Sequence, residues 1–173
     1  MSVVWNIIEK IAEAVFRFCF RIIGKKYTKE IHEGLMQFVK FGIVGVSNTV
    51  LSYLLYSLSL IGMRNMGLFS GTDYIIAQII AFVLSVLWSF YWNNKMVFKM
   101  EDGQERNIWK ALIKTYISYS FTGLFLNSIL LIIWVNVFHI SEFIGPIINL
   151  LISVPLNFII NKFWAFKTKE KED

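Results

Sequence analysis

Asparagine and lysine recur together at two places in the sequence, with a spacing that could support ligand binding. Residues 90–99 and 158–167 share the pattern F-x-x-N-x-x-x-x-F-K at a fixed offset of 68 residues. The asparagines and lysines concerned are Asn93, Lys95, Asn161 and Lys162. An amide donates and accepts hydrogen bonds, whereas an ammonium group forms stronger, charge-assisted bonds with anions. The two endings are therefore candidate binding sites for polar and anionic groups.

Small and polar residues continue both patterns upstream in the same register. The matched pairs are Ser85 and Ser153, Ser89 and Asn157, and Ala81 and Asn149. Because residues four apart share a helix face, each set forms one stripe. Two other apolar segments carry comparable stripes, with Gly42, Gly45, Thr49, Ser52, Tyr56 and Ser59 in one and Tyr116, Ser120, Gly123 and Asn127 in the other. Since small residues also let helices approach closely in lipid, packing alone is an alternative role.

Four long uncharged segments must position these stripes. They lie between Lys40 and Arg64, Asp73 and Lys95, Lys114 and Glu142, and Glu142 and Lys162. About 20 apolar residues cross the hydrocarbon layer as a helix. The chain is 56% hydrophobic and 17% charged, against roughly 45–50% and about 25% for soluble domains. The sequence therefore excludes a soluble enzyme, a disulfide scaffold and a disordered chain, and predicts an all-α membrane protein with spans at roughly 38–63, 74–94, 109–138 and 143–161.

A separate amphipathic helix is predicted before the spans. Its apolar positions follow helical spacing at Val4, Ile7, Ile8, Ile11, Val15, Phe18 and Ile22, and Gly24 is a plausible stop. A basic amphipathic helix of this kind lies in the membrane interface, although packing on the bundle is an alternative. Residues 27–37 have the composition of a polar link. The predicted organisation is thus residues 1–36 as helix and linker, 37–167 as a four-helix transmembrane domain, and 168–173 as a disordered tail.

The distribution of positive charge predicts the orientation of the spans. Sixteen of the seventeen Lys and Arg residues lie in the N-terminal segment, the connection after the second span, or the tail. The positive-inside rule then makes both termini cytoplasmic, in the cell membrane. Two helices per repeat give both halves one orientation, so the spans are predicted to form two parallel two-helix repeats. These cations face anionic lipid headgroups, which argues against nucleic-acid binding.

The sequence argues against several kinds of chemistry. The one cysteine, Cys19, cannot form an internal disulfide, and no Cys/His cluster suggests a metal or cofactor. No acidic residue lies within a span, which argues against proton coupling. Asp73 and Glu142, at the outer ends of helices, could serve an enzyme as carboxylates, but capping those helices is the simpler role. The chain is therefore predicted not to be an enzyme.

The opening F-x-x-F-G-x-x-G-x-x-N-T, together with the paired endings and the four-span length, resembles the GtrA-like family of membrane proteins. The opening consists of Phe38, Phe41, Gly42, Gly45, Asn48 and Thr49. The resemblance covers residues 36–167 and leaves out the N-terminal helix. It implies a role in glycosylation of cell-surface polysaccharide or teichoic acid, in which a polyprenyl-phosphate-linked sugar moves from the cytoplasmic to the outer leaflet. A separate glycosyltransferase would make that lipid.

The resemblance also implies which residues would bind such a lipid. Cations at the inner surface would hold the phosphate, and the candidates are Lys95, Lys162, Lys40 and Lys114. Amides would bind the sugar, and the candidates are Asn48, Asn93, Asn94, Asn127, Asn149, Asn157 and Asn161. Any single lysine could instead be an ordinary snorkelling flank. A non-transporting anchor or activator of the glycosyltransferase is the alternative function, and a homodimer is expected because four short helices enclose little volume.

Overall fold

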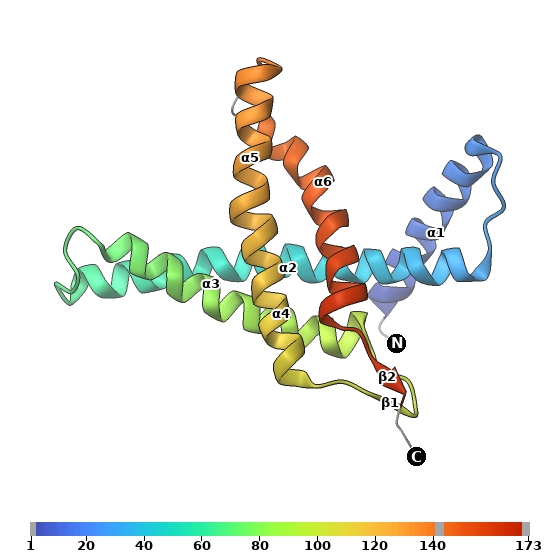
Figure 1. Cartoon of the computed structure of the whole chain (residues 1–173), viewed down its shortest axis with the longest axis horizontal. Helices are drawn as coiled ribbons and strands as arrows, with labels where there is room; N and C mark the ends of the chain where they lie inside the picture. The colour runs from blue at the N-terminus through green and yellow to red at the C-terminus, as the bar shows by residue number, and fades with distance from the viewer. Residues whose placement is uncertain (1–2, 141–143, 171–173) are drawn as a thin grey trace.

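The computed structural model describes residues 3–140 and 144–170 of the chain, and most of them are helical (Figure 1). The α-helices are α1 (Val3–Ile23), α2 (Lys29–Asn65), α3 (Asp73–Trp92), α4 (Ile108–Ser120), α5 (Asn127–Ile132) and α6 (Gly145–Ile160). Four π-helical segments continue them, namely η1 (Asn93–Val97), η2 (Phe121–Leu126), η3 (Ile133–Val137) and η4 (Asn161–Ala165). Two short strands, β1 (Gln104–Glu105) and β2 (Lys169–Glu170), pair antiparallel.

Four helices are long and apolar enough to cross a membrane. They run over Lys29–Asn65, Asp73–Val97, Ile108–Ile132 and Ile147–Ala165. The all-α class is therefore confirmed, and four candidate membrane-spanning helices lie where the four spans were predicted. The third is one continuous rod, because α4, η2, α5 and η3 follow each other without a break.

The predicted polar link at residues 27–37 is wrong, because α2 already begins at Lys29. The Thr28 hydroxyl caps this helix by accepting a hydrogen bond from the Ile31 amide at 3.4 Å. Charged residues in the first turns, such as Glu30 and Glu33, are good helix formers, so polarity here marks a solvated helix rather than a loop. The connection between α1 and α2 is consequently only a few residues long. It begins at Gly24, which has φ +72° and ends α1 as expected.

The C-terminal tail also differs from its prediction. Residues 168–173 were expected to be disordered, yet Glu105 lies opposite Lys169 and Gln104 opposite Glu170 in the β1–β2 pair. Backbone pairing with the connection after η1 gives the start of the tail a defined place. Residues 171–173 lie outside the described residues.

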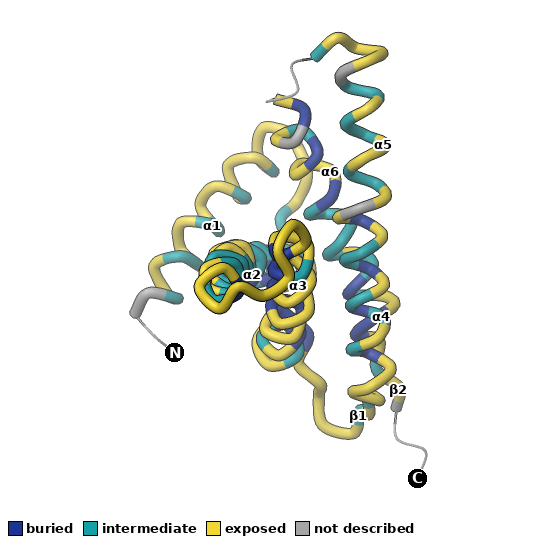
Figure 2. Tube along the Cα trace, turned by 90° about the vertical axis from the view of Figure 1, so that its left-hand side faces the viewer, coloured by how far each residue is buried: buried dark blue, intermediate teal, exposed yellow. Residues whose placement is uncertain are grey.

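The spans form two hairpins that point in different directions. In Figure 1 α2 and α3 lie across the view, whereas α5 and α6 run upright. Figure 2, turned by 90°, looks along α2 and α3 and still shows α4 and α6 upright. The hairpins meet where α3 and α6 end, and they diverge toward their connecting loops. Buried residues concentrate near this meeting point (Figure 2).

Aromatic rings hold the meeting point together. Four of them come from the matched endings, Phe90, Phe98, Phe158 and Phe166, and we call this cluster the junction. Phe98 stacks on Phe166 with ring centroids 4.7 Å apart. Phe41 of α2 packs edge-on against Phe158 at 5.5 Å. Each aromatic pair contributes about 0.5–1.5 kcal/mol beyond its buried area.

Helix α1 stands apart from the bundle and contacts the first turns of α2. Its apolar stripe is exposed at Ile7, Ile11, Val15, Phe18 and Ile22. A stripe left uncovered by protein is compatible with the predicted place in the membrane interface.

Truncating a junction ring should destabilise the fold. We expect Phe98→Ala to lower the free energy of unfolding by about 3 kcal/mol, because a buried ring is lost and its partners are left around a cavity. Phe163→Ala is the matched control, since Phe163 is 67% exposed. Unfolding in mixed detergent micelles measures both. Equal losses in the two variants would contradict the role of the junction.

Candidate functional site

Both matched endings finish in a π-helical turn. The Phe98 amide donates to the Asn93 carbonyl at 2.7 Å, and the Phe166 amide donates to the Asn161 carbonyl at 2.8 Å. A π-turn takes in one more residue than an α-turn and is frequent at functional sites. Matched positions of the sequence thus share one backbone form, and their phenylalanines meet in the junction.

The two asparagines of these turns are fully buried. The Asn93 amide nitrogen lies 3.1 Å from the Ser89 hydroxyl and 3.3 Å from the Tyr119 hydroxyl. The Asn161 amide nitrogen donates to the Asn157 carbonyl at 2.7 Å. In both residues the side-chain oxygen is buried without a partner among the described residues. Because a buried acceptor without a donor costs about 1–3 kcal/mol, these oxygens are strong candidates for ligand binding.

The rod that begins with α4 links the two endings through hydroxyl groups. The Tyr119 hydroxyl lies 2.8 Å from the Ser89 hydroxyl on α3. Toward α6, the Asn157 side-chain oxygen accepts from Thr122 at 2.7 Å and from Ser118 at 3.2 Å. A hydrogen-bonded polar layer therefore joins the two hairpins beside the junction.

A large crevice lies between the diverging hairpins. Its volume is about 910 Å³. Phe41, which packs against the junction, forms part of its wall. Small and polar residues of the predicted stripes line it, among them Gly42, Gly45, Thr49, Ser52 and Tyr56 of α2, Ala81 and Ser85 of α3, Gly123 of η2 and Asn157 of α6. The structure thus brings residues of all four stripes to one space.

The seven candidate asparagines separate into different places. Asn48 and Asn157 line the crevice, and Asn93 and Asn161 lie in the buried polar layer. The Asn94 side-chain oxygen is taken by Arg106. Asn127 and Asn149 line another cavity of about 360 Å³.

In this smaller cavity, both the oxygen and the nitrogen of the Asn149 side-chain amide have hydrogen-bond partners. Its oxygen accepts from the Trp134 indole at 2.9 Å, and its nitrogen donates to the Asn127 carbonyl at 2.8 Å. These contacts tie α5 and η3 to α6. Asn149 therefore has a packing role.

The four candidate lysines are each in contact with an aromatic residue. Each ammonium lies over an aromatic ring: Lys40 over Trp5 at 5.0 Å, Lys95 over Tyr91 at 5.4 Å, Lys114 over Trp164 at 5.2 Å and Lys162 over Phe158 at 5.6 Å. They belong to four different segments, α2, η1, α4 and η4. Since Lys95 stands two positions after Asn93, and Lys162 only one after Asn161, the two lysines leave their turns in different directions.

Arg106 contacts both matched endings, although it was not among the residues predicted from the sequence. Its guanidinium donates to the Asn94 side chain at 2.6 Å and to the Phe98 carbonyl at 2.9 Å. It also lies 5.2 Å from the centre of the Phe166 ring, so it touches both endings. Burial lowers the pKa of Arg106 from its ordinary value. A single arginine in a basic connection gives no signal of this contact, because only the fold brings Phe166 beside it.

The outer carboxylate Asp73 is engaged in an ion pair with Arg64, whose Nε lies 2.8 Å from Asp73 Oδ2. This pair closes the α2–α3 hairpin at its loop and gives Asp73 a structural role. Glu142 lies outside the described residues. Among the residues that the structure describes, no group of three or more His, Cys, Asp or Glu side chains could hold a metal.

Four membrane-length helices around a crevice define a small polytopic membrane protein. Residues 40–166 match the family described as "GtrA/DPMS, transmembrane domain", and the chain belongs to that family. The resemblance seen in the sequence is thereby confirmed.

Two relatives are similar over much of their length. "Cell wall teichoic acid glycosylation protein GtcA" of Listeria monocytogenes serovar 1/2a (strain ATCC BAA-679 / EGD-e) is 28% identical over 148 residues, 83% of this chain and 91% of that protein. "Uncharacterized membrane protein YwcD" of Bacillus subtilis (strain 168) is 26% identical over 102 residues, 59% of this chain and 80% of that protein. No solved structure matches the chain.

Water should reach the crevice but not the lipid-facing side of the same helix. In a Cys19→Ser background, we expect Ser52→Cys to react with a membrane-impermeant maleimide, because Ser52 lines the crevice. Leu54→Cys is the control; Leu54 is exposed but does not line the crevice. Labelling of intact cells followed by a gel-shift assay measures both. Labelling of Leu54→Cys alone would refute a hydrated crevice.

Proposed function

We propose that the chain moves a polyprenyl-phosphate-linked sugar from the cytoplasmic to the outer leaflet of the cell membrane. The sugar would serve glycosylation of a surface polymer such as teichoic acid. The observation that carries the proposal is the crevice, a space between membrane-length helices whose lining is mainly apolar but presents hydroxyl and amide groups. The Listeria relative is named as a teichoic acid glycosylation protein, which supports the same assignment.

The chemistry of the crevice suits a neutral, hydroxyl-rich headgroup. Its volume of about 910 Å³ lies within the range of about 300–1,000 Å³ that is usual for small-ligand sites. Its polar residues are hydroxyls and amides such as Thr49, Ser52, Asn48 and Asn157, and none of the described residues that line it is charged. A prenyl tail is too apolar to need a protein path, so it would stay in lipid while the sugar follows the crevice.

The two hairpins would act as parallel repeats that rock about the junction. The basic segments lie at the end where α3 and α6 finish, so we place this end and both termini on the cytoplasmic side. In the present arrangement the junction closes that end, and the hairpins diverge beyond it. A headgroup from the inner leaflet would therefore require the two endings to separate, which is the alternating-access motion of parallel-repeat transporters.

The phosphate would remain at the cytoplasmic surface until the sugar is admitted. Lys95, Lys162, Lys40 and Lys114 lie around that end, and each ammonium is held over an aromatic ring. These positions offer several separate anion contacts in place of a single clamp. The mechanism involves binding and movement only, so the protein would not be an enzyme, and a glycosyltransferase would supply the lipid.

Filling the crevice should stop transfer without unfolding the protein. A side chain at Gly45 meets open space, because no atom lies within 4 Å of its Cβ position. We expect Gly45→Leu to slow transfer by about tenfold or more, because the leucine side chain would occupy space that the headgroup needs, and about 1.4 kcal/mol of added barrier is tenfold in rate. Val50→Leu is the matched control, because Val50 is exposed and outside the crevice.

The measurement uses purified protein in liposomes that contain a polyprenyl-phosphate sugar. Access of an impermeant sugar oxidant to the inner-leaflet pool reports the transfer. Transfer by the unsubstituted chain and by Val50→Leu, but not by Gly45→Leu, is the expected result. Absence of transfer by the unsubstituted chain, combined with stimulation of a co-reconstituted glycosyltransferase, would favour the anchor or activator role instead.

A further inference from the structure

A groove separate from the crevice lies where α1 approaches α2, on the side of α2 that faces away from the crevice. Its volume is about 460 Å³, and we call it the N-terminal groove. Trp5 and Ile8 of α1 form one wall, and Ile43, Trp88 and Met96 contribute to the others. None of these five residues lines the crevice, so the two spaces are distinct.

The polar groups around the N-terminal groove are mainly hydrogen-bond donors. Lys40 and Lys99 line it with two ammonium groups, and none of the described residues that line it carries a carboxylate. Trp92 also lines it, and the buried indole nitrogen of Trp92 has no partner among the described residues. The Ser47 hydroxyl is already engaged, because it donates to the Val44 carbonyl and accepts from Trp88. The groove thus combines positive charge and a spare N–H with apolar walls.

We propose that the N-terminal groove binds the phosphate of an anionic lipid from the cytoplasmic leaflet. The phosphate would lie between Lys40 and Lys99 within reach of the Trp92 indole, and the first part of the hydrocarbon chain would lie against Trp5 and Met96. Charge complementarity carries this choice of ligand, since phosphate accepts from ammonium and indole donors and repels none of the groove residues.

The depth of the groove relative to the membrane favours a lipid over a soluble anion as its ligand. Trp88 and Trp92 lie in the last turns of α3, and tryptophan favours the headgroup level of a membrane. The exposed apolar stripe of α1 would place this helix at the same level. The inference does not depend on which lipid is transported, although it assigns Lys40, one of the four candidate phosphate contacts, to a specific place.

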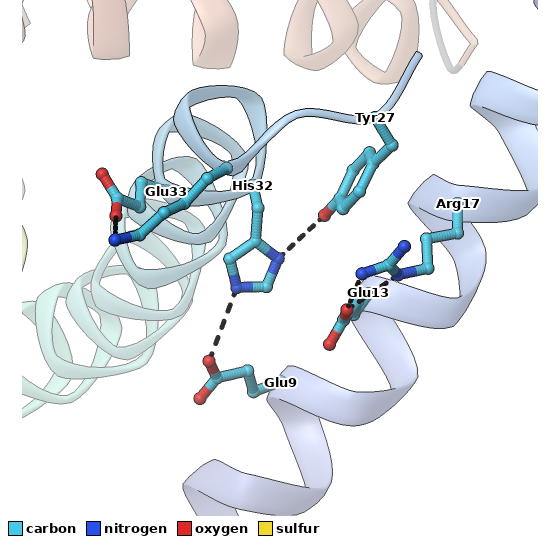
Figure 3. A network of polar contacts seen from close by, with 7 residues as sticks. Glu9, Glu13, Arg17, Tyr27, His32 and Glu33 are labelled. Atoms are coloured by element: carbon cyan, nitrogen blue, oxygen red, sulfur yellow. Dashed lines mark hydrogen bonds and ion pairs between the residues drawn. The ribbon is translucent and has the colours of Figure 1, made fainter. Parts of the chain in front are cut away.

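A polar network fixes the wall that α1 contributes. The His32 ring on α2 lies 3.7 Å from the Glu9 carboxylate through Nε2 and accepts or donates a hydrogen bond with Tyr27 at 3.0 Å through Nδ1 (Figure 3). Arg17 lies 4.9 Å from the centre of the Tyr27 ring and binds Glu13. Burial and the neighbouring Glu13 raise the pKa of Tyr27 above its ordinary value. These contacts hold α1 against α2 beside the groove.

One wall of the N-terminal groove comes from a part of the chain outside the family match. The family match covers residues 40–166, so Lys40 and Lys99 belong to it whereas α1 does not. A bundle without α1 would leave the two lysines on an open surface. The N-terminal helix converts this surface into a groove with two walls.

The test compares lipid selectivity in full-length protein. Purified protein is reconstituted in phosphatidylcholine vesicles with trace spin-labelled phosphatidylglycerol or phosphatidylcholine, and electron paramagnetic resonance measures the relative association of each lipid. We expect Lys40→Ala combined with Lys99→Ala to reduce the preference for phosphatidylglycerol by about tenfold or more, because each lysine near anionic lipid contributes about 1 kcal/mol. Lys25→Ala combined with Lys26→Ala removes the same charge outside the groove and is expected to keep the preference.

Two further arms keep the proposal falsifiable. Trp5→Ala changes no charge but removes part of the wall, so it should also weaken the preference, even if the double-lysine variant fails to fold. Inorganic phosphate should not compete with the lipid. The proposal is overturned if both lysine pairs give equal losses, if Trp5→Ala has no effect, or if inorganic phosphate displaces the labelled lipid.

Discussion

The packing of the two matched endings against each other is the interaction on which the rest of the structure depends. Lipid offers no hydrophobic drive for helix association, so contact and hydrogen bonding must hold the hairpins together. The stacked pair Phe98 and Phe166 supplies contact, and the Tyr119 hydroxyl of the second hairpin supplies hydrogen bonds with Ser89 and Asn93 of the first. Because these contacts gather at one end, the other ends of the hairpins can diverge, and the crevice exists as a consequence.

Buried polar atoms without hydrogen-bond partners lower the stability of the fold in the same region, and such atoms are typical of binding sites. Four asparagine side chains have a buried oxygen without a partner among the described residues: Asn48, Asn93, Asn127 and Asn161. Leucine or alanine at these positions would avoid that cost, since an unpaired buried polar group is destabilising. Natural sequences tolerate such local conflicts mainly at functional sites. Three of these four residues lie in the crevice or directly beside the junction.

Much of this arrangement could be predicted from the sequence, because membrane spans and helical stripes leave simple patterns. Charge-free runs located the four helices, and spacing of three and four placed Gly45, Thr49 and Ser52 on one face. Three features had no such signal. The π-turns at Asn93 and Asn161 depend on tertiary packing, the contact of Arg106 with Phe166 joins distant segments, and the helical start of α2 was hidden by its polarity.

The central claim is that the two endings must part before a headgroup can be transferred, and a reversible crosslink across them tests it most directly. Glu105 and Lys169 lie opposite each other in the β1–β2 pair, one in the connection after η1 and the other after η4. In a Cys19→Ser background, cysteines at both positions should form a disulfide on oxidation. The account predicts that oxidation stops transfer of the lipid-linked sugar in liposomes and that reduction restores it. Transfer at the full rate by the oxidised, crosslinked protein would contradict the account.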